Sequence, residues 1–426
     1  MEPSAERGAA TVAAPVVPAA VVPPAVVPEA TPARPVAAAD ALWLDLAAAD
    51  NLPIITALFE LERTPSVEAL ARIAGQVADL PLLRRRAVRT GRRWRWQPAV
   101  PDLGAHVEVR PCADWQQELA SILATDLDLA RPLWKLYLLQ APDKVVLVVR
   151  LHHALGDGST LVAALLDLAG AREAALPRPR SGRLRALLDV PAAAARLLAR
   201  HAEPLTLKSP LSGVKHARIS APFPLAELKA AAHARDVTLN DLLAGALGSA
   251  LSATLPGRPS LTAAAPLSLR RRTVGGNRFG IVLLALPAGD VEASVRAAAS
   301  YLRRLKRSGE ALAVNLAFRA AALAPHGLVR LLSAVLGRRA SLVFSNVVGP
   351  TAPVRLGGVG VRDLSFLVPQ VSTIGLGVSA LSYAGQVQVG FSADAATVPD
   401  LDALVAAFTE RVRQLLQPVP AGAQRE

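Results

Sequence analysis

Two adjacent histidines follow an apolar run, and an aspartate stands four positions after the second of them. The stretch "KVVLVVRLHHALGDGS" places His152 and His153 at the end of the run and Asp157 in a Gly-Asp-Gly sequence. A neutral imidazole, with an ordinary pKa of about 6.5, is a suitable base for a hydroxyl or a thiol near neutral pH. The spacing therefore indicates a catalytic base with its support, and the alternative is two structural histidines at the end of a strand.

The expected strand separates the two imidazoles. Neighbouring side chains of a strand point to opposite faces, so His152 and His153 cannot both reach one reacting atom. A metal site would instead need histidines at i,i+2 on a strand or i,i+4 on a helix. We expect one imidazole to face a cleft and the other to face protein. We expect Asp157 to hold the loop through local hydrogen bonds or an ion pair with an arginine.

Motifs for other kinds of catalysis are missing from the chain. It contains no G-x-S-x-G elbow, no P-loop and no G-x-G-x-x-G stretch that opens a helix. Cys112 is the only cysteine, which excludes an intrachain disulfide and a multi-cysteine zinc site and fits a reducing compartment. The sequence thus favours direct acyl transfer by a histidine, without a covalent intermediate, a cofactor or a metal.

Composition describes a basic globular protein. The 426 residues suffice for two or three domain-sized units, and 52% of them are hydrophobic. The net charge of +13, almost all of it from arginine, fits nucleic acid or an anionic membrane surface. With only 4% aromatic residues, stacking on single-stranded nucleic acid is disfavoured. The uncharged stretch 8–28 contains five prolines. In the uncharged stretch 364–393, "GLGVSALSY" and "QVQVGFSA" read as a buried hairpin, so we expect no transmembrane helix.

The alternation of helical and strand patterns in both halves predicts two similar α/β lobes. Helical spacing is found in 66–88, 114–128, 224–255, 291–312 and 400–416, with Thr64 or Ser66 as a candidate cap for the first. We divide the chain into a disordered Pro/Ala-rich tail (1–38), an N-terminal lobe with the histidine motif (39–175), a basic crossover linker (176–218), a C-terminal lobe (219–418) and a short tail (419–426).

The histidine motif also resembles a known signature. H-H-x-x-x-D-G, here His152 to Gly158, is similar to the motif of the CoA-dependent acyltransferase superfamily, which includes chloramphenicol acetyltransferase and the condensation domains of peptide synthetases. Over roughly residues 40–416 the chain resembles the bacterial wax ester synthase / acyl-CoA:diacylglycerol acyltransferase family. The collinear segments are "RPLWKLYLL", "LHHALGDGST", "PLSG", "VTLNDLLAGALGSAL", "PLSLR", "GNRFGIVLLALP", "SNVVGP", "LSYAG" and "DLDAL".

This resemblance implies a fold and an activity. The fold would be α/β (α+β): two chloramphenicol-acetyltransferase-like lobes of mixed sheets flanked by helices, with an active-site tunnel between them. The activity would be transfer of a fatty acyl group from acyl-CoA to a long-chain alcohol or diacylglycerol. His153 would be the general base beside His152, and Asp157 would fix the loop through an arginine such as Arg270.

The resemblance extends to residues of the second half. Asn240 and Asp241 match an Asn-Asp pair at a helix start, where Asn240 shapes the cleft or is merely a helix cap. The other residues implied are Gly158 in the loop and, as polar groups for CoA or the developing oxyanion, Asn277, Ser345 and Asn346. The last two are alternatively part of a strand-to-loop turn before Gly349. The chain departs from relatives in lacking a histidine in "NLPIITALFELE" and in having Val348 where proline is usual.

The implied partners are acyl-CoA and a lipid alcohol or diacylglycerol, without nucleic acid or metal. Arginines 270–272 are candidates for attracting the CoA phosphates. The basic helices expected in 183–200 and 315–338 favour a cytoplasmic protein in peripheral contact with the membrane or with lipid inclusions, although buried helices would look alike. Two alternatives stay open: a condensation-type acyltransferase with another acceptor, and a catalytically silent lipid-binding relative.

Overall fold

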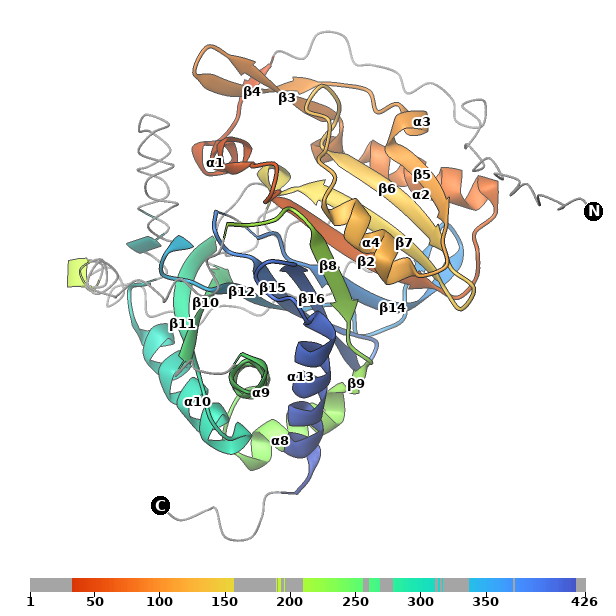
Figure 1. Ribbon diagram of the computed structural model, residues 1–426. Helices are drawn as coiled ribbons and strands as arrows, with labels where there is room; N and C mark the ends of the chain where they lie inside the picture. Colours follow the sequence, from red (N-terminus) through yellow and green to blue (C-terminus); the bar gives the residue numbers. More distant parts are fainter. Residues whose placement is uncertain are drawn as a thin grey trace, which may run out of the picture.

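Three β-sheets and the helices around them make up the described part of the chain (Figure 1). The computed structural model describes residues 33–156, 210–255, 260–268, 279–310, 337–370 and 372–418, together with 189, 191, 192, 195, 313, 314 and 316. The expected linker (176–218), the helices expected in 183–200 and 315–338, and both tails lie largely outside these residues.

The first lobe is built on a six-stranded sheet with the order β13-β14-β2-β7-β6-β5. The strands are β2 (Ile54–Leu61), β5 (Val107–Pro111), β6 (Trp134–Gln140), β7 (Val145–His152), β13 (Arg355–Leu356) and β14 (Val359–Leu367). Only β5 and β6 pair in parallel. The central strands are apolar almost throughout, because helix α2 (Val67–Asp79) covers one face and helix α4 (Trp115–Leu123) covers the other.

Strand β14 comes from the second half of the chain but pairs antiparallel with β2, and Leu364 lies opposite Phe59. In Figure 1 it appears as a blue strand beside the red β2. The expected boundary at residue 219 therefore does not hold for 355–367, because this segment completes the first lobe's sheet.

The second lobe is built on a seven-stranded mixed sheet with the order β11-β10-β12-β15-β16-β8, and β9 also pairs with β16. Its strands are β8 (Lys215–Ile219), β9 (Phe223–Pro224), β10 (Ser260–Ser268), β11 (Phe279–Pro287), β12 (Leu342–Val348), β15 (Leu376–Tyr383) and β16 (Gln386–Asp394). Strands β15 and β16 form the expected buried hairpin.

Four helices gather on one side of this second sheet (Figure 1). They are α8 (Leu225–Ala234), α9 (Leu239–Thr254), α10 (Val291–Arg307) and α13 (Leu401–Leu416). The expected helix over 224–255 is interrupted between α8 and α9, where Asp236 has a φ of 51°. Helix α9 is buried from Asp241 to Leu251 and forms the centre of the lobe's core. Mixed sheets flanked by helices in two lobes confirm the fold class predicted from the sequence.

The two lobes are joined by strands packed face to face. β14 of the first sheet lies against β15 and β16 of the second. The Tyr383 hydroxyl donates to the carbonyl of Val361 at 2.8 Å, and the Ser379 hydroxyl donates to the carbonyl of Phe366. The side chains of Leu381 and Tyr383 belong to the core of the first lobe. The lobes therefore share their interior instead of meeting through a thin linker.

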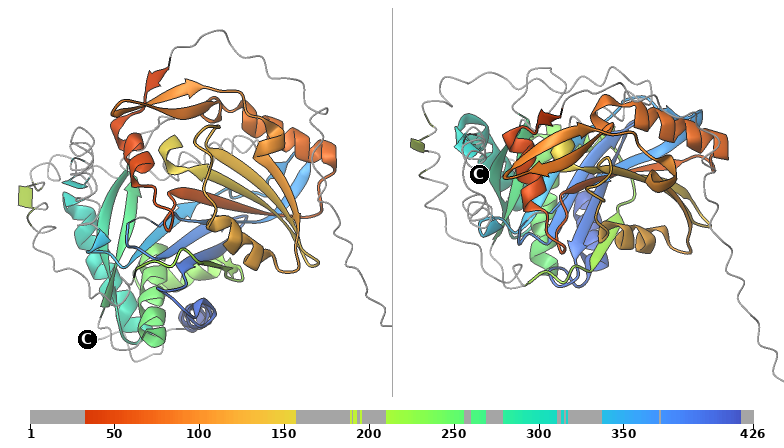
Figure 2. Two further views of the ribbon diagram at one scale, coloured as in Figure 1. Left: turned by 45° about the horizontal axis from the view of Figure 1, so that its top comes forward. Right: turned by 90° about the horizontal axis from the view of Figure 1, so that it is seen from above.

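A small third sheet lies at the edge of the first lobe, beside helix α1 (Ala38–Leu46), in Figures 1 and 2. It contains β1 (Arg34–Pro35), β4 (Arg93–Pro98) and β3 (Arg85–Thr90), in that order. Because Arg34 pairs with Trp96, ordered structure begins within the tail expected over 1–38. Residues 1–32 lie outside the described part.

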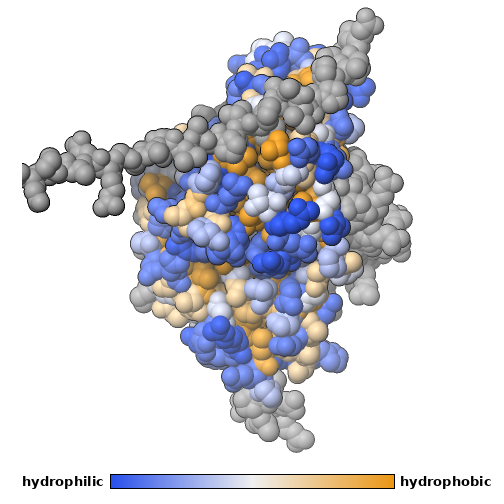
Figure 3. All heavy atoms as spheres, turned by 90° about the vertical axis from the view of Figure 1, so that its right-hand side faces the viewer, coloured by the Kyte–Doolittle hydropathy of each residue, from blue (hydrophilic) through white to orange (hydrophobic). Residues whose placement is uncertain are grey.

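Among the helices of the described part of the chain, none has both the length and the apolar character needed to cross a bilayer. On the face seen in Figure 3, small groups of hydrophobic residues are interspersed among hydrophilic ones.

Candidate active site

The two histidines stand where β7 ends and a short 3-10 helix, η3 (His153–Leu155), begins. The backbone NH of His152 donates to the carbonyl of Leu133 at 3.1 Å, and that of His153 donates to the carbonyl of Pro53 at 2.8 Å. Segments next to β6 and β2 thus hold both residues in place. β7 ends at His152 and η3 begins at His153, so the alternation of side chains along a strand does not extend to His153.

His152 faces the protein interior. It is 2% exposed, and its Nδ1 accepts a hydrogen bond from the backbone NH of Ala154 at 3.1 Å. Burial, and after it the electrostatic influence of the neighbouring His153, lowers the pKa of His152 to about 3. Such a group stays neutral at physiological pH and is too weak a base to accept a proton from a hydroxyl. His152 is therefore a support for the turn.

His153 is fixed by an aromatic partner from α1. Its imidazole stacks on the indole of Trp43, with ring centroids 3.8 Å apart and an angle of 20° between the planes. Both residues are 8% exposed. One face of the imidazole is thereby covered, and the orientation of the ring is set by helix α1.

Trp43 is a site residue that sequence reasoning missed. A tryptophan in the apolar helix "AADALWLDL" is typical of an ordinary core position. No spacing in the sequence connects it with the histidines, because the contact arises only when α1 packs on η3 in the folded chain.

A polar cavity of about 30 Å³ lies between the lobes, close to the same strand end. Arg150, 1% exposed, lines it from β7, and Lys215 and Gln370 line it from the second half. Arg150 donates to the carbonyl of Thr125 at 2.6 Å, and burial lowers the pKa of this arginine. A space of this size holds one or two water molecules, so it is a polar contact between lobes and not a lipid channel.

Two of the predicted residues of the second half lie side by side. The Asn346 amide points its Nδ2 at the Oδ1 of Asn240, at 3.5 Å, although the two come from β12 and α9. Asn346 is exposed, whereas Ser345 before it is buried at 8% exposure. The pair therefore offers an exposed polar edge on the second lobe, and Ser345 faces inward.

The start of α9 corrects one expectation. Thr238, not Asn240, is the N-cap: its hydroxyl accepts from the NH of Asp241 at 3.3 Å. Asp241, 2% exposed, accepts from the NH of Thr238 at 2.8 Å and completes a capping box. Asp241 is thus a structural residue, and the side chain of Asn240 is left for other contacts.

The remaining predicted site residues, Asp157, Gly158, Arg270 and Asn277, lie outside the described residues. The same holds for arginines 271 and 272. Within the described part, no group of three His, Cys, Asp or Glu side chains is placed to hold a metal ion.

The "PLSG" segment is held by a buried aspartate. Asp394, fully buried, accepts from the NH and hydroxyl of Ser212 at 2.9 and 2.8 Å and from the NH of Gly213 at 2.9 Å. Lys215 lies 3.4 Å from this carboxylate and donates to the carbonyl of Asp50 in the first lobe at 2.6 Å. The network ties both lobes together, and it depends on residues far apart in the sequence.

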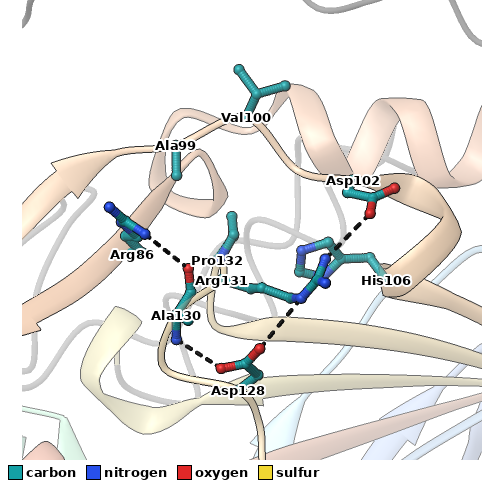
Figure 4. Close-up of a pocket in the computed structure, with 9 residues that line it drawn as sticks. All are labelled: Arg86, Ala99, Val100, Asp102, His106, Asp128, Ala130, Arg131 and Pro132. Carbon is teal, nitrogen blue, oxygen red and sulfur yellow. Dashed lines mark hydrogen bonds and ion pairs between the residues drawn. The ribbon is translucent and has the colours of Figure 1, made fainter.

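A second hollow, of about 370 Å³, lies beside the loop that precedes β6 (Figure 4). Arg131 reaches across it to Asp102 at 3.2 Å and to Asp128 at 3.3 Å. Next to this guanidinium, His106 is stacked on Trp134, and burial lowers the pKa of the histidine. Because Arg131 forms ion pairs with both aspartates, these three side chains are already occupied and are not available to a substrate.

Comparison with known proteins places the chain in a family. The wax ester synthase/diacylglycerol acyltransferase catalytic domain matches residues 37–215, and the C-terminal domain of the same family matches residues 275–416. The chain belongs to the wax ester synthase/diacylglycerol acyltransferase family. Each lobe contains residues matched by these models, and the catalytic-domain match includes the histidine motif.

Individual members of this family are similar along most of the chain. A putative diacylglycerol O-acyltransferase of Mycobacterium bovis is 26% identical over 375 residues, which cover 74% of this chain and 79% of that protein. Another, of Mycobacterium tuberculosis, is 28% identical over 344 residues and covers 67% and 71%.

Solved structures share the fold. A wax ester synthase/diacylglycerol acyltransferase from Marinobacter aquaeolei has a TM-score of 0.65 at 19% identity, covering 89% of this chain and 98% of that one. The starter condensation domain of rhizomide synthetase, solved with C8-CoA, has a TM-score of 0.60 at 15% identity, covering 90% and 94%. The acyltransferase family and the condensation domains therefore have the same two-lobed architecture.

Proposed function

We propose that the protein transfers a fatty acyl group from acyl-CoA to the hydroxyl of a long-chain alcohol or a diacylglycerol, with His153 as general base. The observation that carries this proposal is the position of His153: held by Pro53 at the end of β7, and stacked on Trp43, in a chain of this acyltransferase family. The reaction needs no cofactor, since acyl-CoA is itself a substrate.

The chemistry is a single displacement at the thioester. His153 accepts the proton of the acceptor hydroxyl while its oxygen attacks the thioester carbonyl. The C–S bond then breaks, and the CoA thiolate takes the proton back from the imidazolium, so the enzyme returns to its starting state. His152 supports this cycle by remaining neutral beside a cation that forms only transiently.

The other expected residues complete the site around this step. The loop Asp157–Gly158, held through an arginine such as Arg270, keeps His153 facing the substrates. The exposed edge of Asn240 and Asn346 is our candidate for stabilising the oxyanion or binding CoA, together with Asn277. We place the substrates in a tunnel between the lobes, CoA entering from one side and the lipid from the other.

The partners follow from the substrates. A related condensation domain solved with C8-CoA supports acyl-CoA as donor for this fold. The acceptor is a lipid, so we place the protein in the cytoplasm, in peripheral contact with the inner face of the membrane or with lipid inclusions. The names of the mycobacterial relatives favour diacylglycerol over a long-chain alcohol.

Thiol release from palmitoyl-CoA tests the proposal. We expect purified protein to release CoA when hexadecanol or dipalmitoylglycerol is added, and the His153→Ala variant to lose this release. The rate of release should fall by about 10²- to 10⁴-fold, as is typical when a general base is removed. The His152→Asn variant is measured beside it, because the asparagine side chain can still accept the hydrogen bond from the NH of Ala154.

Either of two outcomes contradicts the proposal. Release that proceeds at an unchanged rate in His153→Ala rules out this residue as the base. Release that is absent with both lipid acceptors, from protein with an intact melting transition, favours the catalytically silent relative.

A further inference from the structure

The hairpin formed by β3, β4 and their turn carries an unusual density of positive charge. Between Leu80 and Pro101 there is no acidic residue, and the segment contains seven arginines: 84, 85, 86, 89, 92, 93 and 95. We call residues 84–98 the arginine hairpin. Arg89, Arg92, Arg93 and Arg95 in it are exposed. Like charges gathered on one small element repel each other, unless an external anion compensates them.

Several arginines elsewhere in the described part form ion pairs with carboxylates. Arg110 binds Glu108 at 2.6 Å, Arg218 binds Asp402 at 2.6 Å, and Arg235 binds Glu292 at 2.6 Å. Neither Arg92 nor Arg93 makes an ion pair or a side-chain hydrogen bond with any described residue. The positive charge of the hairpin tip is therefore available to a partner.

The two tryptophans of the hairpin do not form a stacking platform. Trp96 is 6% exposed with the guanidinium of Arg85 over its ring at 4.3 Å. Trp94 donates to the carboxylate of Asp45 at 2.9 Å and lies under Arg89. Both rings are occupied within the protein, although they alternate with arginines in the sequence. This disfavours nucleic-acid bases as the partner, since these bind exposed aromatic faces.

The exposed arginines also do not surround a pocket. Neither of the two hollows described above is lined by any of the four. They belong to β3, β4 and the turn between them, and this hairpin lies at the edge of the molecule in Figures 1 and 2. Such an arrangement suits an extended anionic surface better than a single small ligand.

The hairpin is connected to the candidate base through one helix. Trp94 of β4 binds Asp45 of α1, and Trp43 of α1 stacks on His153. A partner bound at the hairpin therefore lies next to the element that orients the imidazole.

We infer that the arginine hairpin docks the protein onto an anionic lipid surface, and thereby brings α1 and His153 toward the layer that holds the lipid acceptor. The choice of a lipid surface as partner rests on the proposed function; the charge and exposure of the hairpin do not. Each arginine near an anionic membrane contributes favourably and additively, and salt screens the attraction.

Vesicle sedimentation tests this inference with the full chain. The wild type should bind vesicles of phosphatidylcholine mixed with phosphatidylglycerol, bind phosphatidylcholine alone much more weakly, and dissociate with added salt. The Arg92→Gln/Arg93→Gln variant should bind the mixed vesicles roughly 30-fold more weakly, from two lost charges. The matched control is Arg303→Gln/Arg304→Gln, which removes two adjacent exposed arginines from α10.

Three results of the binding measurements overturn the inference. Vesicle binding is weakened equally in both variants, or it is not weakened in the hairpin variant, or the wild type binds duplex DNA more tightly than mixed vesicles at the same salt. A raised KM for acyl-CoA with unchanged vesicle binding also overturns it, because the arginines then serve the donor. Acyl transfer to a water-soluble short-chain alcohol, measured without vesicles, separates the two proposals. Its absence in the wild type contradicts the proposed function alone.

Discussion

The imidazole of His153 lies against the indole of Trp43, with ring centroids 3.8 Å apart and planes 20° from parallel. The two residues come from η3 and α1, which pack against each other. A general base must be held in a productive orientation before the acceptor arrives. We therefore regard Trp43 as the positioning residue of the proposed site.

Replacing Trp43 tests this role. We expect Trp43→Leu to lower kcat by about 10- to 100-fold, because a small displacement of the base is costly, and to change the KM for acyl-CoA much less. Trp43→Phe retains a flat ring and should keep most of the activity. The rates are compared at a temperature below the melting transition of both variants. If Trp43→Leu turns over like the wild type, the stacking has no role in positioning.

His152 should make the protein sensitive to acid. Its pKa is about 3 in the folded chain, against about 6.5 in the unfolded chain. Between these values the unfolded chain binds a proton that the folded chain does not. The free energy of unfolding therefore falls as the pH drops from about 6.5, by up to about 1.4 kcal/mol per pH unit from this residue.

Urea unfolding of the wild type and of His152→Asn, followed from neutral pH to about pH 5, measures this contribution. Asparagine does not titrate, and its side-chain oxygen can accept the hydrogen bond from Ala154. The wild type should lose stability more steeply than the variant as the pH falls. Parallel curves would mean that His152 is protonated equally in both states.

The sequence predicted local structure far better than contacts between distant segments. Ser66 caps α2 and accepts from the NH of Ala69, as helical spacing after a serine indicates. The break between α8 and α9 went unpredicted because alanine and leucine continue on both sides of Asp236. Periodicity records which face of an element is apolar, and it does not record interruptions made by one residue in a left-handed conformation.

The same contrast between local structure and contacts of distant segments holds for the site. The position of the histidine pair at the end of an apolar strand could be predicted from the sequence. The insertion of β14 beside β2 and the stacking of Trp43 on His153 could not, because each joins segments that share no sequence pattern. Asn240 and Asn346 were named from a resemblance to a family, and their proximity emerged only in the folded chain.

The buried carboxylate of Asp394 should contribute strongly to stability. Removing it in Asp394→Ala leaves Lys215 and the NH groups of Ser212 and Gly213 without their acceptor, at a cost of about 3–5 kcal/mol. The matched control is Asp402→Ala, whose exposed ion pair with Arg218 is worth at most about 1 kcal/mol. Chemical denaturation measures both, and similar losses would contradict the assigned role of Asp394.

Two helical glycines should respond in opposite directions to alanine. A Cβ at Gly245 in α9 would lie 2.5 Å from the Cα of Val295 in α10, so Gly245→Ala should destabilise by about 1–3 kcal/mol. Gly75 in α2 has open space at the same point, and Gly75→Ala should stabilise by about 0.5–1 kcal/mol. Thermal unfolding measures the melting temperature of both variants against the wild type. Equal shifts of the melting temperature would show that α9 and α10 can move apart at little cost.

Asn240 and Asn346 should act as one unit if their shared edge serves the reaction. Their amides are 3.5 Å apart, and neither is needed for the capping box of α9, which Thr238 and Asp241 form. We expect Asn240→Ala and Asn346→Ala each to lower kcat/KM by about 10-fold or more, and the double variant to fall little further, because residues that act together are not additive. Steady-state rates of CoA release are compared for the wild type, the two single variants and the double variant. Thr254→Ala, remote at the other end of α9, is the control. Losses that simply multiply in the double variant would mean that the two amides act independently, and unchanged rates in all three variants would remove this edge from the proposed site.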